Sequence, residues 1–191
     1  MSDDLAAMVA RIEAYQAIQQ LPIRYALAVD GRDLDAWVAL FVPDVDMGRR
    51  GSGRQVLREY IEPHLRWFYR SIHQIVGHRI ELLDDDTAKG AVYCRAEHEV
   101  GERWIVMAIC YFDDYRRVEG EWLFERRGER HWYAVDVLER PQSVGFDSWE
   151  RTAGPPSLPD GFPMWTTFFD DDEAVRHITG SPSSRESPRS G

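Results

Sequence analysis

The sequence predicts an α+β domain in which a helical N-terminal third precedes an antiparallel sheet. Good helix formers dominate up to Asp30, and four long segments of alternating apolar and polar residues follow from His73 onward. Short turn sequences separate these four segments, and this pattern favours a meander of neighbouring strands. We expect the sheet to curve and the helices to cross its open side, so that the domain forms a cone with a hollow mouth.

The first helical segment covers about residues 3–30. Pro22 predicts either a break into two helices or a kink. In its second part, Ile23, Leu27 and Asp30 fall on one stripe of the helix surface, which we expect to be buried. An aspartate on an apolar stripe is costly unless it has a partner, so Asp30 becomes a candidate functional residue.

Turn and capping signals divide the rest of the chain. Gly31 is expected to end the first helix, and Asp33 to cap a short second helix that ends near Leu40. The further elements expected are a short strand at 45–47, a third helix at about 54–69 that is interrupted near Pro63, and strands at 73–83, 87–100, 103–116 and 122–138. Residues 1–140 then form the domain, 141–179 an aromatic C-terminal arm and 180–191 a disordered tail.

Composition and charge exclude several classes of function. The net charge is −10 without a basic tract, which argues against binding to nucleic acid or to an anionic membrane surface. Cys94 and Cys110 lie inside predicted strands and form no CxxC pair, so they indicate neither a zinc site nor a redox motif. No signal-peptide pattern and no membrane-length apolar run is present, and a cytoplasmic location is expected.

Asp30 and His73 form the first hypothesis about chemistry. His73 begins a strand at a position where alternation predicts a buried apolar side chain. A carboxylate that binds one imidazole nitrogen fixes the tautomer and leaves the other nitrogen as a base. The alternative for each residue alone is structural: a helix-end aspartate and a hydrogen-bonded core histidine.

Further candidates surround this pair. His98 shares the apolar face of the next strand, and Tyr25 lies about 140° around the helix from Asp30, so only a broad cavity would use both. Alternation places Arg126 on the inner face of the last strand, whereas Arg127 reaches that face only if a bulge intervenes, for which Gly128 is a candidate. One of the two arginines is expected to stabilise a developing anion.

The sequence is rich in aromatic residues, with seven Trp, eight Tyr and eight Phe. Such an excess suits a pocket for flat or polycyclic ligands, although aromatic side chains also fill cores and interfaces. Trp37, Trp67 and Tyr69 are the side chains that we expect to contact a substrate, together with His98.

The order of these motifs resembles the SnoaL-like family of the nuclear transport factor 2-like superfamily, over about residues 8–140. The resemblance is carried by three stretches: Tyr25-x4-Asp30-Gly-Arg-Asp33, Ser71-Ile72-His73 and Tyr115-Arg-Arg-x-Glu-Gly-x-Trp122-x-Phe124. It implies a cone-shaped, cystatin-like α+β fold. Among the members are bile acid 7α-dehydratase, scytalone dehydratase and hexachlorocyclohexane dehydrochlorinase.

The resemblance implies a cofactor-independent lyase of the dehydratase type that acts on a hydrophobic, polycyclic or steroid-like hydroxylated molecule. In this interpretation His73 is the base, Asp30 orients it, Arg127 stabilises the enolate-like charge, and Tyr25, with His98, donates to the leaving oxygen. No metal or organic cofactor is expected. A ketosteroid-type isomerase, a polyketide cyclase and a non-catalytic binding or supporting subunit are the alternatives. A homo-oligomer is expected, with a trimer favoured and a dimer possible.

Overall fold

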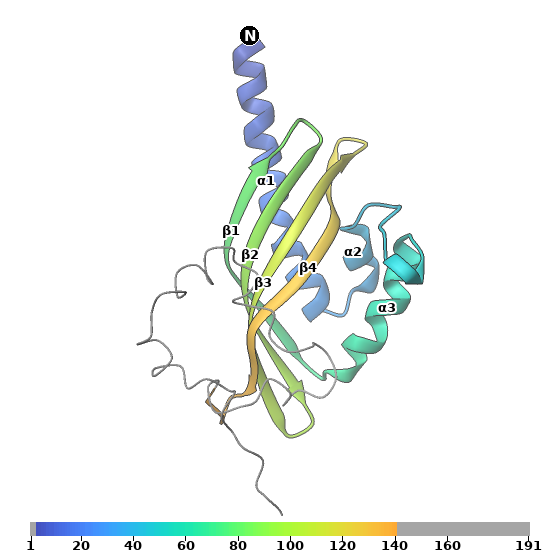
Figure 1. The fold of residues 1–191 in the computed structure, drawn as a ribbon, viewed down its shortest axis with the longest axis vertical. Helices are drawn as coiled ribbons and strands as arrows, with labels where there is room; N and C mark the ends of the chain where they lie inside the picture. Colours follow the sequence, from blue (N-terminus) through green and yellow to red (C-terminus); the bar gives the residue numbers. More distant parts are fainter. Residues whose placement is uncertain (1–2, 141–191) are drawn as a thin grey trace, which may run out of the picture. The chain divides into compact units, whose positions relative to one another are not determined.

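The computed structural model describes residues 3–140. It contains helices α1 (Asp3–Asp30), α2 (Leu34–Ala39) and α3 (Arg54–Trp67), a 3-10 turn η1 (Gly48–Arg50), and strands β1 (Ser71–Leu82), β2 (Thr87–Val100), β3 (Arg103–Val118) and β4 (Glu121–Asp136). The strands pair in the order β1-β2-β3-β4, and every pair is antiparallel. Figure 1 shows a curved, unclosed sheet with the three helices along one side of it. The predicted α+β meander is therefore confirmed, while the arm and tail expected at 141–191 lie outside the described residues.

Helix α1 differs from the prediction in two respects. It is one continuous helix with Pro22 inside it, so the expected break into two helices is wrong. The expected buried stripe is also wrong, because Leu27 is 70% exposed and Ile23 is exposed as well. The buried face instead includes Ile18 and Leu21, and this packing against the sheet offsets the backbone hydrogen bond that a proline cannot donate.

The remaining helical predictions hold with small changes. Asp33 caps α2, since its side chain accepts a hydrogen bond from the backbone N–H of Ala36 at 2.9 Å. Helix α3 runs through Pro63, so the interruption expected there is wrong, and the helix buries Leu57 and Leu65. The short strand expected at 45–47 is reduced to a single bridge between Asp46 and Ser52. None of the helices within residues 3–140 is long and apolar enough to cross a membrane.

Two hydrophobic clusters hold the helices on the sheet. One joins α1, α2 and α3 to the strand ends, and there the rings of Phe41 and Phe124 lie 5.2 Å apart. The other lies on the inner face of β2 and β3 and includes Cys94. Both cysteines are free and buried, as predicted for small hydrophobic side chains.

Bulges decide which side chains face the helices. One bulge at Val76 shifts the register of β1, so that His73 and Ile75 point inward before it and His78 and Ile80 after it. Another bulge at Glu125 shifts the register of β4 relative to β3. Because strand side chains alternate between faces, each bulge exchanges the inner and outer sets of residues as far as the next bulge, which in β4 lies at Trp132.

Candidate active site

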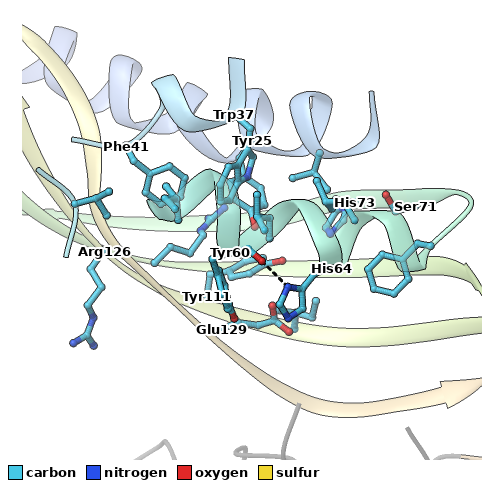
Figure 2. A pocket seen from close by; sticks show the side chains of 18 of the residues that line it. Tyr25, Trp37, Phe41, Tyr60, His64, Ser71, His73, Tyr111, Arg126 and Glu129 are labelled. Carbon is cyan, nitrogen blue, oxygen red and sulfur yellow. Dashed lines mark hydrogen bonds between the residues drawn. The ribbon is translucent and has the colours of Figure 1, made fainter. Parts of the chain in front are cut away.

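A cavity of about 600 Å³ lies between the inner face of the sheet and the helices. This volume falls within the range of small-molecule binding pockets. The lining is mostly aromatic and aliphatic, with polar side chains from α1 and from all four strands, and it includes Tyr25, His73, His98, Tyr111, Arg127 and Glu129. Figure 2 shows this arrangement from close by. The shape and chemistry suit an apolar ligand with a few polar groups.

The end of α1 determines where the Asp30 carboxylate lies. The turn that follows places Arg32 at a φ of 59°, and a Cβ on Gly31 would lie only 2.9 Å from the carbonyl oxygen of Leu27. Gly31 is therefore required for close packing, and Arg32 adopts the left-handed conformation. The Arg32 guanidinium then donates a hydrogen bond of 2.7 Å to the hydroxyl of Ser71 at the start of β1.

The structure brings Asp30 and His73 together. Nδ1 of His73 lies 2.7 Å from Oδ1 of Asp30, and the His73 backbone N–H donates to Oδ2 at 2.8 Å. Ser71 donates a third hydrogen bond to the carboxylate at 3.0 Å. Burial opposes ionisation of Asp30, but the hydrogen bonds and charge of His73, aided by Ser71, outweigh it and lower the pKa of Asp30. The carboxylate is thus fixed as a hydrogen-bond acceptor, and Nε2 is the imidazole nitrogen left for other partners.

His98 lies beside His73 on the neighbouring strand. The two rings meet edge to face with centroids 5.5 Å apart, and the ring of Phe68 covers His98 at 4.4 Å. Burial lowers the pKa of His98 to about 3, and the nearby His73 adds to this effect. His98 is therefore neutral near pH 7 and can take part in hydrogen bonding but not as a cation.

Arg127, and not Arg126, has its guanidinium in the interior. The Arg127 side chain is 4% exposed and forms a double hydrogen bond with the fully buried Asp113, at 2.9 and 2.8 Å. The Arg126 side chain is 73% exposed, and Figure 2 shows it pointing away from the other labelled residues. The bulge that exchanges the two arginines lies at Glu125 and not at the expected Gly128.

Aromatic rings enclose the guanidinium. Its central carbon lies 4.4 Å from the ring centroid of Tyr25, 4.1 Å from that of Tyr111 and 4.5 Å from that of Phe124. Burial raises the pKa of Tyr25 to about 12, although the charge of Arg127 acts in the opposite direction. Tyr25 therefore keeps its proton near pH 7 and presents a hydrogen-bond donor. It shares the cavity with Asp30's partner His73, whose ring centroid is 6.4 Å away.

Glu129 is a cavity residue that the sequence prediction missed. It pairs directly with Tyr111 across β3 and β4, and both side chains line the cavity. The residue is exposed by surface area, so its carboxyl group reaches both the cavity and solvent; desolvation by the cavity wall raises its pKa, and the charges of His73 and Arg127 oppose this rise. With the bulge at Glu125, alternation turns Arg127, Glu129 and His131 inward together, and this pattern was the available signal.

The expected substrate-binding aromatics divide into two groups. Trp37 is buried and lines the cavity, where its ring lies 5.8 Å from that of Tyr25. Trp67 packs at the edge of the cluster on β2 and β3 and does not line the cavity. Tyr69 is 79% exposed and also lies outside the cavity lining. Within residues 3–140 no group of three or more His, Cys, Asp or Glu side chains is placed to bind a metal ion.

Comparison with known proteins identifies the family. The SnoaL-like domain model matches residues 10–128, which is most of the region that the structure describes. The chain belongs to the SnoaL-like family. No curated protein matches the sequence at a significant level.

Solved structures of similar fold support the assignment of this SnoaL-like protein. A Novosphingobium aromaticivorans protein provisionally named scytalone dehydratase is 22% identical, with a TM-score of 0.59 over 70% of this chain and 94% of that chain. Hexachlorocyclohexane dehydrochlorinase LinA-type3 from Novosphingobium barchaimii is 21% identical, with a TM-score of 0.61 over 69% and 95%. Rv3472 from Mycobacterium tuberculosis, a protein of unknown function, is 26% identical, with a TM-score of 0.55 over 64% and 78%. At these identities the likeness establishes the fold.

Proposed function

We propose that this protein is a cofactor-independent lyase that removes water from a hydrophobic hydroxylated small molecule, of polycyclic or steroid-like shape, with a carbonyl group next to the reacting carbons. The observation that carries the proposal is the 2.7 Å contact between Asp30 and His73 at the wall of a cavity of about 600 Å³. The names of two similar structures, a dehydratase and a dehydrochlorinase, agree with an elimination.

In the proposed reaction Nε2 of His73 removes the proton next to the substrate carbonyl. Asp30 accepts the hydrogen bond of Nδ1–H and stabilises the imidazolium that forms. Negative charge then develops on the carbonyl oxygen. The buried Arg127 and the protonated Tyr25 are the donors proposed to stabilise this enolate, because a guanidinium fixed by Asp113 needs no reorganisation during the reaction.

The direct test is a screen of polycyclic β-hydroxy ketones, including hydroxysteroids and hydroxylated polyketides, with the purified full chain. Formation of the conjugated enone is followed by its ultraviolet absorbance, and loss of water by mass spectrometry. We expect His73→Ala to lower kcat/KM by roughly 10²–10⁴-fold, the usual contribution of a general base. Gln74→Ala is the matched control, since Gln74 is the next residue of β1 and its side chain is exposed.

Two results would contradict the proposal. One is an active protein whose rate does not depend on His73. The other is binding of these ketones without turnover, which would favour a ligand-binding module. If the double bond of an unsaturated ketone moves and no water is lost, the protein is an isomerase that uses the same base.

A further inference from the structure

The proposed reaction needs an acid, because hydroxide is a poor leaving group unless a proton reaches it as the carbon–oxygen bond breaks. The cavity lining contains several side chains that carry protons, and three of them are poorly suited to this role. Tyr25 has its pKa raised to about 12, and His98 has its pKa lowered to about 3, so the first is a weak acid and the second carries no extra proton near pH 7. Arg127 is committed to Asp113 and does not release a proton.

We propose that Glu129 is the catalytic acid that protonates the departing hydroxyl group. Glu129 stands on β4 and His73 on β1, the two edge strands of the sheet, and both side chains line the same cavity. A substrate in the cavity would thus meet the base on one wall and the acid on another. This inference rests on the proposed elimination and adds the residue that selects an oxygen leaving group.

The surroundings of Glu129 raise the affinity of its carboxylate for a proton. Among residues 3–140 no salt bridge or hydrogen bond to its carboxylate is present, even though Arg127 is two positions away on the same face of β4. Asp113 binds the guanidinium from the neighbouring strand, so Arg127 forms no ion pair with Glu129 and acts on it only through its charge at longer range. Desolvation in the cavity then raises its pKa, which brings the acid nearer to the pH at which it must donate.

The proton balance of the cycle is complete. His73 takes the proton from the carbon next to the carbonyl, the electron pair moves into the enolate and then into the new carbon–carbon double bond, and the carbon–oxygen bond breaks. The departing oxygen takes the proton of Glu129 and leaves as water. The imidazolium of His73 and the carboxylate of Glu129 return to their starting states when one proton passes between them through water in the emptied cavity.

The test compares two leaving groups in one β-substituted cyclic ketone, hydroxide and chloride. Chloride leaves without a proton, so Glu129→Gln is expected to lower kcat by roughly 10²–10⁴-fold on the hydroxy ketone and to leave the chloro ketone unaffected. His73→Ala is expected to slow both. Glu121→Gln is the matched control, because Glu121 is exposed at the start of the same strand. The wild-type rate on the hydroxy ketone alone should fall as pH rises through the raised pKa of Glu129, a readout that needs no variant.

The outcomes separate this inference from the proposed function. If the wild type eliminates from both ketones and Glu129→Gln slows neither or both equally, Glu129 is not the acid, while the elimination stands. A falling alkaline limb that appears with both leaving groups also overturns the role of Glu129. If the wild type acts on neither ketone, and on none of the other β-hydroxy ketones, the elimination itself fails and the acid role falls with it.

Discussion

Removing the carboxylate of Asp113 should destabilise the protein strongly. Asp113 is fully buried, and among residues 3–140 it is the ion-pair partner of the Arg127 guanidinium, which is 4% exposed. Its Oδ2 also accepts a hydrogen bond of 2.9 Å from the hydroxyl of Tyr115. Asp113→Ala therefore leaves a buried positive charge and a buried hydroxyl without this acceptor. The loss of one partner of a buried ion pair costs about 3–5 kcal/mol, a large part of the 5–15 kcal/mol that is typical of a whole domain.

The neighbouring pair provides the control. Asp114 and Arg126 form an ion pair at 3.6 Å on the same two strands, but both side chains are more exposed. Asp114→Ala is expected to cost about 0–1 kcal/mol. Urea unfolding of both variants, followed by tryptophan fluorescence, gives the two free energies of unfolding. The double variant Asp113→Ala/Arg127→Met should regain part of the loss, because it removes the uncompensated charge.

Equal and small losses for Asp113→Ala and Asp114→Ala would refute this reasoning. Such a result would mean that water or another acceptor reaches the Arg127 guanidinium, and that its position in the cavity does not depend on Asp113. The proposed stabilisation of an enolate by a fixed guanidinium would then lose its physical basis.

Two other predictions concern the stability of the fold. The pKa of His98 is lowered from 6.5 to about 3, so below pH 6.5 the unfolded chain binds a proton that the folded protein does not. The free energy of unfolding therefore falls as pH falls. His98→Gln should reduce this slope by up to about 1.4 kcal/mol per pH unit, measured by urea unfolding at a series of acidic pH values. Gly90→Ala should lower the free energy of unfolding by about 1–3 kcal/mol in the same assay, because the added Cβ would lie 2.9 Å from Cε2 of Tyr115 and 3.0 Å from Nε2 of His78. An unchanged stability would show that these rings move aside without cost.

The sheet was predictable from the sequence because its signals are local. Alternation and turn residues place β2 at Thr87–Val100 and the other strands within two residues of their observed ends. The turn at Glu119–Gly120 also follows the local rule, since both residues have a positive φ, as a two-residue hairpin turn of type I′ requires.

Helix α1 was harder to predict because propensity does not reveal which face the sheet covers. The apolar residues of α1 lie on more than one face, so Ile23 and Leu27 looked as suitable for burial as Ile18 and Leu21. In the structure Ile23 and Leu27 are exposed. Asp30 nevertheless meets His73, because the end of the helix and the start of β1 fix their contact and the buried stripe does not.

The missed Glu129 has the same physical origin as the misplaced bulge. With unbroken alternation from Phe124, Arg126 and Gly128 face the cavity, while Arg127 and Glu129 face outward. The extra residue at Glu125 exchanges the two sets at once. A bulge is a property of strand pairing, and no single residue in this stretch of the sequence indicates where it lies. With the bulge at Glu125 and not at Gly128, Arg127 and Glu129 face the cavity together.

The exchange also explains how the cavity holds an acid and a cation on one strand face. Arg127 and Glu129 would neutralise each other if they were the only charges there, and Glu129 would then remain ionised. The register of β3 places Asp113 directly opposite Arg127 and Tyr111 opposite Glu129. Asp113 binds the guanidinium, whereas the buried Tyr111 offers Glu129 no positive charge. The pairing of the two strands therefore holds the positive charge of Arg127 on Asp113 and leaves Glu129 without an ion pair among residues 3–140.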